Sequence, residues 1–478
     1  SDCFPLVTMR PPFLNGNGVL IAVLDSGIAY ERREFRTAEG NTRIRYLWDQ
    51  TLEREFSQEQ INEALRAESM EERFTIVPSV DVSGHGTAVA GLAAGYSEQD
   101  GYYGAATAAD LLIVKLGLPS ESGFPRTVEI MRGVTYALQK AEELEMPLVI
   151  NLSFGNSYGA HNGTALLERF LDDASGIGRT VICVGSGNEG SAAGHFAGNI
   201  EESRQIELSI AEYERSMSVQ FWQNYSDSYR IVLRSPGGEE AELTAPAGES
   251  FTGGRAYTLR LEQTEVYVYQ GMPTPYSTSQ ELYLEMIPAA GQYINRGIWS
   301  FQLEPLRVVT GDFYLYLPAA AGRNARSVFL NPTPQVTLTI PSTASRVITV
   351  GAYDPYYFAY ADFSGRGYIN AGENVGTVGA GDVKPDLVAP GVGVRAVDAL
   401  GGYTAVTGTS FATPIVSGGA ALLMEWGIVR ENNPFLYGEK MKAYLRRGAR
   451  PLRGEERYPN ERVGFGALCV SDSILLTL

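Results

Sequence analysis

The sequence predicts an α/β protein with a parallel β-sheet, interrupted by one inserted antiparallel β module. Short uninterrupted apolar runs alternate with helix-like segments from residue 18 to about residue 199. Period-two alternation replaces the helix signal from residue 200 to about residue 340, and the apolar runs then resume. These changes of period predict an α/β domain made of residues 1–199 and 341–478, with residues 200–340 as the insertion.

Four apolar runs in the first segment have the composition of buried parallel strands. They are GVLIAVLD (18–25), DLLIVKLG (110–117), PLVINLSFG (147–155) and TVICVGSG (180–187). Between them, apolar residues recur with a period near 3.6, which predicts helices at 128–144 and 165–175. Ser57 followed by Gln60 has the pattern of a capping box and predicts the start of another helix. This strand–helix alternation predicts a parallel sheet covered by helices.

The inserted segment consists of short runs with period-two alternation. The runs are SMSVQFW, YRIVLRS, YTLRLEQ, EVYVYQG, ELYLEMI, WSFQLEP and DFYLYLP, with clusters of Gly, Pro, Asn and Ser between them. Their spacing predicts an antiparallel sandwich or a jelly roll. After the insertion, RVITVGAYD (346–354) predicts another buried strand, and helices are predicted at 410–426 and 439–449.

Composition excludes several classes of partner. The 478 residues carry a net charge of −17, which repels nucleic-acid phosphates and anionic lipids. No run of eighteen uninterrupted apolar residues occurs, so no membrane span is predicted, and the N-terminal SDCFPLVTMRPP has no apolar signal-peptide core. The three cysteines, Cys3, Cys183 and Cys469, form no disulfide framework, and Cys183 is expected to be a small buried apolar residue.

Four glycine-rich blocks stand at predicted ends of strands or helices. VLDSGI carries Asp25, SGHGTAVAGLAAG carries His85, VGSGNEG carries Asn188 and GTSFATPIVSGG carries Ser410. Taken singly, each block has a structural alternative, because an aspartate can cap a turn and a serine can cap a helix. Taken together, Asp, His and Ser follow one of the chain orders in which Ser-His-Asp catalytic triads occur.

The blocks DSG, HGTAVAG, GNEG and GTSFATP resemble those of the subtilases, over roughly residues 18–199 and 341–450. Within that family the chain is most similar to the Csp-like subtilases of spore-forming clostridia. The supporting stretches are TLTIPSTASRVITVGAYD, YADFSGRGY, KPDLVAPGV, GTSFATPIVSGGAALLMEWGIV and LYGEKMKAYLRRGAR. The resemblance implies a doubly wound, subtilisin-like parallel sheet with the site at its C-terminal edge. It also implies a jelly-roll insertion between the Asn block and the Ser block.

The resemblance assigns a role to each polar residue of the four blocks. Ser410 is the expected nucleophile, His85 the general base and acid, and Asp25 the residue that orients the imidazole. Asn188 and the Ser410 N–H form the expected oxyanion hole. The segment Leu152–Gly155 resembles an edge that pairs with the substrate backbone, although Ser153 is alternatively a sheet residue without substrate contact. The residues expected to bind substrate are Leu116, Gly117, Leu152, Ser153, Phe154, Gly155 and Gly187.

Other polar residues receive structural interpretations. His161 and His195 lie in loop-like surroundings and are expected at the surface, with the rim of the cleft as an alternative for His195. Glu189 either borders the specificity pocket or is exposed to solvent. The stretch GYSEQDGYYGAATAAD after the His85 helix offers only Glu98 and Asp100 before the next strand, so no calcium site is predicted there. No other metal and no cofactor are expected.

The sequence therefore predicts a serine endopeptidase that acts on proteins or peptides. The alternative is a catalytically silent Csp-like pseudoprotease that acts as a sensor or scaffold. By resemblance, the enzyme is expected to be bacterial, spore-associated or secreted, and to cleave off its own N-terminal propeptide before Ser1. The β insertion is expected to be structural, with substrate selection as the alternative.

Overall fold

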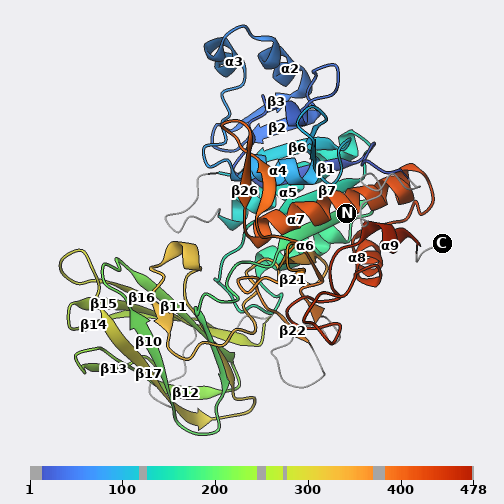
Figure 1. Ribbon diagram of the computed structural model, residues 1–478. Coiled ribbons are helices and arrows are strands. Elements are labelled where there is room, and N and C mark those ends of the chain that lie inside the picture. Colours follow the sequence, from blue (N-terminus) through green and yellow to red (C-terminus); the bar gives the residue numbers. More distant parts are fainter. Residues whose placement is uncertain (1–12, 118–125, 245–253, 273–276, 370–382, 476–478) are drawn as a thin grey trace.

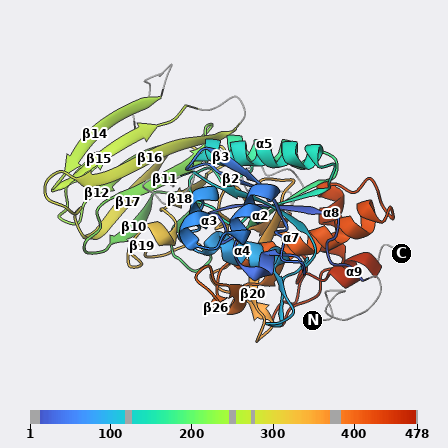
Figure 2. The same ribbon diagram turned by 90° about the horizontal axis from the view of Figure 1, so that it is seen from above.

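The computed structural model describes residues 13–117, 126–244, 254–272, 277–369 and 383–475, which form two lobes (Figure 1). An α/β lobe contains both ends of the described chain, and a β module projects from one side of it (Figures 1 and 2). The α/β lobe is therefore assembled from segments that precede and follow the β module in sequence.

One nine-stranded sheet forms the middle of the α/β lobe. Its strands are β1 (Leu20–Asp25), β2 (Ile44–Asp49), β3 (Arg54–Ser57), β6 (Asp110–Lys115), β7 (Leu148–Leu152), β8 (Thr180–Gly185), β20 (Ile348–Asp354), β21 (Ala359–Tyr360) and β24 (Leu387–Pro390). Their order is β21-β20-β8-β7-β1-β6-β2-β3, with β24 paired to β20. The strands pair in parallel except for β3 and β21, which are antiparallel to their neighbours.

Helices cover both faces of this sheet (Figure 2). They include α4 (His85–Ala94), α5 (Thr127–Glu143), α6 (Leu166–Ser175), α7 (Thr409–Met424) and α8 (Gly438–Arg447). Alternate residues of β1 belong to different cores: Ile21 and Val23 pack in the cluster with α4, α7 and α8, whereas Leu20 and Leu24 pack in the cluster with α5 and α6. Both faces of a parallel strand are thus apolar, as the uninterrupted run in the sequence predicted. The doubly wound α/β fold is confirmed.

The remaining described elements of the α/β lobe are short. They are the 3-10 helix η1 (Arg33–Phe35), helices α2 (Gln58–Arg66), α3 (Met70–Ile76) and α9 (Val470–Leu475), the π-helix η3 (Glu425–Val429), and the strand pairs β4 (Tyr96–Ser97) with β5 (Tyr102–Tyr103), β22 (Tyr368–Ile369) with β23 (Val383–Lys384), and β25 (Val394–Val397) with β26 (Tyr403–Val406). Both hydrogen bonds of the predicted capping box between Ser57 and Gln60 are present at α2.

Helix α7 and the π-helix that follows it run from Thr409 to Val429. This stretch is long and apolar enough to cross a membrane by length and composition, but 89% of its most apolar window is buried inside the protein. It packs against β7, β8, β20 and β24. Its apolar character is therefore that of a core helix.

Two antiparallel sheets form the β module. One contains β10 (Arg204–Ile210), β12 (Ser228–Arg234), β13 (Glu240–Glu242), β17 (Gly297–Arg307) and β19 (Val328–Phe329), and the other contains β9 (His195–Asn199), β11 (Met217–Asn224), β14 (Arg255–Leu261), β15 (Thr264–Gln270), β16 (Ser279–Pro288) and β18 (Asp312–Tyr316). The 3-10 helix η2 (Ala320–Gly322) follows β18. Alternate residues of both sheets share one apolar cluster, which includes Leu208, Val219 and Phe301. Strand β9 precedes residue 200 and pairs with β18.

The expectation of surface positions for His161 and His195 is wrong. Each is 3% exposed, and both rings stack on the ring of Tyr316, with centroids 3.8 Å and 4.4 Å from it. His161 lies in the α/β lobe and Tyr316 ends β18, so this stack joins the lobe to the β module. Local patterns could not indicate this stack, because Tyr316 is more than 100 residues from either histidine in sequence.

Candidate active site

Asp25 is the last residue of β1 and therefore lies at the C-terminal edge of the parallel sheet. Its side chain is almost fully buried, and Oδ1 accepts a 2.7 Å hydrogen bond from the Ser26 N–H. Ligand sites in open α/β sheets lie at this edge. The position of Asp25 thus follows directly from the end of its strand.

His85 begins α4 and faces Asp25. Its Nδ1 lies 2.7 Å from Asp25 Oδ1, and because a carboxylate only accepts, this nitrogen carries the donated proton. Helix α4 comes close to the loop after β1, since a Cβ on Gly86 would overlap the carbonyl oxygen of Gly27. The glycine after His85 therefore allows the imidazole to reach the strand end.

Two opposing influences act on the imidazole of His85. Burial lowers its pKa, whereas the charge and hydrogen bond of Asp25, and more weakly the charge of Asp81, raise it. The attraction prevails, and the pKa of His85 lies above its ordinary value. One third of the side chain remains exposed, so the ring is open to a reacting group.

Asp81, which was not among the predicted site residues, connects the Asp25 motif to the His85 motif. Its Oδ1 accepts hydrogen bonds from the Ser26 hydroxyl (2.8 Å) and the Gly84 N–H (3.0 Å). Its Oδ2 accepts from the N–H (2.8 Å) and hydroxyl (2.6 Å) of Thr87. The Thr87 hydroxyl in turn accepts from the Ala29 N–H. Asp81 thus holds the loop after Asp25 against the first turn of the His85 helix. Its place four residues before His85, in SVDVSGHGT, was the available signal.

Ser410 is the second residue of α7, at the N-terminus of that helix. The ring of its neighbour Phe411 lies 5.2 Å from the His85 ring, and α4 contacts α7. The structure therefore brings the start of the Ser410 helix beside the start of the His85 helix. Gly408 precedes this turn with a φ of 149°.

Asn188 follows β8 and is fixed by α7. Its Oδ1 accepts hydrogen bonds from the N–H (3.0 Å) and hydroxyl (3.1 Å) of Thr409. The backbone N–H of Thr409 can bond only to the oxygen of the Asn188 amide, which identifies Oδ1 as the acceptor. The Nδ2 donor of Asn188 therefore takes no part in these two bonds. A Cβ on Gly408 would lie 3.4 Å from this Nδ2. The amide donor of Asn188 therefore lies beside the backbone turn that leads into Ser410.

Ser153 has a different environment from the one expected of an edge strand. Strand β7 ends at Leu152, so Ser153, Phe154 and Gly155 lie beyond it. The Ser153 side chain is 2% exposed, accepts a bond from Asn151 and donates one of 2.8 Å to the Ser410 carbonyl. Its hydroxyl therefore ties the segment after β7 to α7.

The other predicted substrate residues lie around the same sheet edge. The Leu116 N–H bonds to the Asp25 carbonyl, and the Gly117 N–H donates 2.9 Å to the Gln50 side chain. Gly155 and Gly187 both face the side chain of Thr339. The structure therefore gathers the predicted residues near the ends of β1, β6, β7 and β8.

Glu189 lies at the boundary between the lobe and the β module. Its carboxylate accepts two hydrogen bonds, of 3.1 Å and 3.2 Å, from the Ala320 N–H. Burial raises its pKa, partly opposed by that bond and by Arg323. Together with His195, Thr333 and Arg366, it lines a cavity of about 390 Å³. Glu189 is therefore held by the β module.

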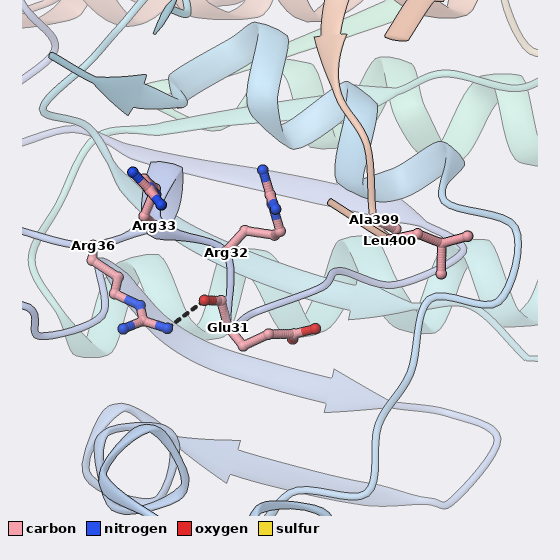
Figure 3. Close-up of a pocket in the computed structure, with 6 residues that line it drawn as sticks. All are labelled: Glu31, Arg32, Arg33, Arg36, Ala399 and Leu400. Atoms are coloured by element: carbon pink, nitrogen blue, oxygen red, sulfur yellow. Dashed lines mark hydrogen bonds between the residues drawn. The ribbon is translucent and has the colours of Figure 1, made fainter. Parts of the chain in front are cut away.

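A second cavity, of about 360 Å³, is lined by Glu31, Arg32, Arg33, Arg36, Ala399 and Leu400 (Figure 3). Its lining residue Ala399 lies close to Gly84, because a Cβ on Gly84 would lie 3.4 Å from it. The close-up shows arginines gathered on one wall. Arg32 pairs with Glu34 at 3.0 Å, and Arg33 lies 3.4 Å from Asp100. Acidic side chains already balance these two guanidinium groups.

Asp100 is one of the two carboxylates that follow the His85 helix before the next predicted strand. Besides pairing with Arg33, it accepts a 2.7 Å hydrogen bond from the Ser97 hydroxyl. Within the part of the chain that the structure describes, no group of three or more His, Cys, Asp or Glu side chains could hold a metal ion.

Fold and site define a serine peptidase of the subtilisin class. The subtilase family model matches residues 16–281 and 315–466, so the chain belongs to the subtilase family. Over nearly its whole length the chain is similar to the solved CspB protease of Clostridium perfringens. The two are 34% identical with a TM-score of 0.89, and the match covers 99% of this chain and 96% of that one.

Two curated relatives match over shorter stretches. The serine protease AprX of Bacillus subtilis is 32% identical over 158 residues, which are 29% of this chain and 32% of AprX. The human membrane-bound transcription factor site-1 protease is 40% identical over 119 residues, which are 25% of this chain and 11% of that protein. The matches thus span a third or less of these curated relatives.

Proposed function

We propose that this protein is a serine endopeptidase that hydrolyses peptide bonds with Ser410 as nucleophile. The hydrogen bond of 2.7 Å between His85 and Asp25, next to the N-terminus of the Ser410 helix, carries this proposal. An imidazole oriented by a buried carboxylate is the base that activates a serine hydroxyl. The silent-pseudoprotease alternative is disfavoured because this chain retains Asp25, His85 and Ser410.

In the proposed reaction Ser410 Oγ attacks the carbonyl carbon, and its proton passes to Nε2 of His85. The C–N bond then breaks, and His85 returns the proton to the leaving amine. Water then attacks the carbonyl carbon of the acyl-enzyme and gives a proton to His85. The bond between that carbon and Ser410 Oγ breaks, the acid product departs, and His85 returns the proton to Ser410. Asp25 keeps Nδ1 protonated throughout and stabilises the imidazolium.

The oxyanion of each tetrahedral intermediate is stabilised by two donors. One is Nδ2 of Asn188, whose amide is fixed by its two bonds from Thr409. The other is the backbone N–H of Ser410 at a helix N-terminus. Such donors require no reorganisation during the reaction, and loss of one lowers kcat by about 100- to 1,000-fold, a figure measured on a subtilisin.

The proposed substrates are extended peptide segments. The residues after β7 lie at the same sheet edge as Asp25, and an extended peptide can add to such an edge through main-chain hydrogen bonds. We also propose that the enzyme is made as a precursor and removes its own N-terminal propeptide, as the family resemblance implies. A Ser410→Ala precursor would then keep the larger mass when the full-length gene is expressed.

Cleavage of a denatured protein tests the proposed activity. Wild type is expected to generate peptide fragments, which mass spectrometry identifies, while Ser410→Ala generates none. Ser203→Ala is the matched control, because Ser203 is exposed in the β module. Absence of fragments with wild type, under conditions where its fold is intact by circular dichroism, would contradict the proposal and favour a sensor or scaffold.

A further inference from the structure

The backbone carbonyl of Ser410 lacks the hydrogen bond that an α-helix normally gives it. In α7 the donor to this carbonyl would be the backbone N–H of residue 414, four residues further along the helix. Residue 414 is Pro414, which has no N–H. The candidate nucleophile therefore belongs to a residue whose carbonyl its own helix leaves unpaired.

Ser153 supplies the missing donor from outside the helix. Its hydroxyl lies 2.8 Å from the Ser410 carbonyl oxygen, and because a carbonyl only accepts, the hydroxyl proton points to Ser410. Ser153 directly follows β7, which ends at Leu152, and is only 2% exposed. A buried bond from the end of β7 thus replaces the helical bond that Pro414 removes.

Two residues of the core hold the Ser153 hydroxyl in place. Asn151 Nδ2 donates a 2.8 Å hydrogen bond to Ser153 Oγ, and the Ser417 hydroxyl donates one of 2.8 Å to Asn151 Oδ1. Asn151 and Ser417 are both fully buried. The three bonds run in one direction, from Ser417 to the Ser410 carbonyl, so each bond polarises and strengthens the next.

Asn151 is a polar residue in a strand that is otherwise apolar. Alternate residues of β7 face opposite sides of the sheet: Val149 packs in the cluster with α7, whereas Ile150 and Leu152 pack in the cluster with α5 and α6. Asn151 shares the face of Val149 and therefore points to α7. A leucine there would fill a similar volume without the cost of burying an amide, but it could not hold Ser153.

We propose that Asn151 and Ser417 position the nucleophile Ser410. They act through the Ser153 hydroxyl, which replaces the donor that Pro414 lacks. This inference rests on the proposed peptidase function. Ser410 provides both the attacking Oγ and one N–H of the oxyanion hole, so a small displacement of this residue impairs both, and displacements of about 1 Å can lower rates about 100-fold. Ser417 itself lies roughly 10 Å further along the helix and takes no part in the proposed proton transfers.

Restoring the missing N–H tests this role. Ser153→Ala should lower kcat at least about tenfold with little change in KM, because the Ser410 carbonyl loses its donor while the substrate contacts remain. Pro414→Ala gives the helix a backbone N–H at position 414. In that background Ser153→Ala should lower kcat by less than about threefold, since the helix now supplies the bond. An equal loss in both backgrounds, or wild-type kcat in Ser153→Ala, would overturn the proposal.

A second set of variants tests the two core residues and leaves Pro414 in place. Asn151→Leu, which keeps the shape, should reproduce the loss of kcat in Ser153→Ala. Ser417→Ala should also lower kcat, and this effect should vanish when Ser153 is already alanine, because the two residues act along one chain of bonds. Wild-type kcat in Asn151→Leu or Ser417→Ala, or losses that multiply in Ser153→Ala/Ser417→Ala, would contradict a role through Ser153.

Two controls separate positioning from stability and from the peptidase proposal. Ser473 is a matched buried serine in α9, whose hydroxyl donates a bond of the same 2.8 Å length to the Cys469 carbonyl. Ser473→Ala should lower Tm about as much as Ser153→Ala and leave kcat unchanged; an equal loss of kcat would show that lost stability explains the effect.

Fluorophosphonate labelling reports the reactivity of Ser410 without a peptide substrate. A wild-type protein that does not label fails the peptidase proposal rather than this one. Where wild type labels, the rate of labelling should fall in Ser153→Ala and recover in Ser153→Ala/Pro414→Ala relative to Pro414→Ala. A wild-type labelling rate in Ser153→Ala would overturn the positioning role.

Discussion

The Thr87 hydroxyl donates a 2.6 Å hydrogen bond to Asp81, in the first turn of the helix that begins with His85. The same carboxylate holds Ser26, the residue after Asp25. The distance between His85 and its orienting carboxylate, Asp25, therefore depends on a second acidic residue, Asp81, which has no part in the proposed proton transfers.

Replacing Asp81 tests whether this residue positions His85 and Asp25 without binding the substrate. Asp81→Ala leaves the donors of Ser26, Gly84 and Thr87 without an acceptor and should destabilise the protein by roughly 3 kcal/mol. It should also lower kcat more than tenfold with little change in KM. Urea unfolding and steady-state kinetics measure the two effects. Asp81→Asn retains the shape and one carbonyl acceptor, and should recover part of kcat. Equal losses in both variants would contradict a positioning role.

The rate should depend on pH through His85. The proposed reaction needs neutral His85, and Asp25 raises the pKa of this ring, so protonation should slow kcat/KM as pH falls through a value above about 6.5. Asp25→Asn removes the charge that favours the imidazolium. Its acidic limb should therefore move to lower pH, while kcat falls by about 10⁴-fold. A limb that stays at the same pH in Asp25→Asn would exclude His85 as the titrating group.

The stacked histidines should make the protein acid-sensitive. Burial is the main cause that lowers the pKa of His161 to about 4 and that of His195 to about 3, against about 6.5 in the unfolded chain. Below pH 6.5 the unfolded state binds protons that the folded state does not, so stability falls as pH falls. At pH 5 each histidine should cost about 2 kcal/mol relative to pH 7.5.

Thermal unfolding at pH 7.5 and pH 5 measures this loss. In a His161→Gln/His195→Gln variant the decrease of Tm between the two pH values should be smaller than in wild type, because glutamine does not titrate. The variant is expected to be less stable at both pH values, so only the difference is diagnostic. The same decrease in both proteins would show that other groups cause the acid sensitivity.

Gly86 should tolerate no side chain. A Cβ there would overlap the Gly27 carbonyl, so Gly86→Ala must push α4 away from the loop after Asp25. We expect a destabilisation of about 1–3 kcal/mol, as for overpacking, together with loss of the His85–Asp25 hydrogen bond and of most activity. Gly178→Ala is the control, because nothing lies within 4 Å of a Cβ there. Wild-type kcat in Gly86→Ala would refute the close-approach argument.

The sequence predicted the candidate site best where functional residues stand at the ends of strands or the starts of helices. Asp25 ends an apolar strand, and His85 and Ser410 begin helices of small residues, so each stands at a boundary that local patterns reveal. The two faces of the central sheet were also predictable, because a parallel strand buried on both sides has no polar alternation.

Contacts between distant segments were beyond local patterns. Thr339 follows the β insertion in sequence but contacts Gly155 and Gly187, which precede the insertion. Tyr316 stacks on His161 and His195 at the junction between the α/β lobe and the β module. The end of β7 at Leu152 was missed as well, since PLVINLSFG is apolar or small beyond that point. For Thr339 and Tyr316, the partners that decide the environment are remote in sequence.

Covalent labelling with a fluorophosphonate, followed by peptide mapping of the modified residue, tests the identity of the nucleophile most directly. The predicted result is one phosphonylated residue, Ser410, with labelling strongly slowed in His85→Ala and absent in Ser410→Ala. Modification of another serine, or labelling of Ser410→Ala at the wild-type rate, would contradict the assignment of Ser410, His85 and Asp25 as the catalytic triad.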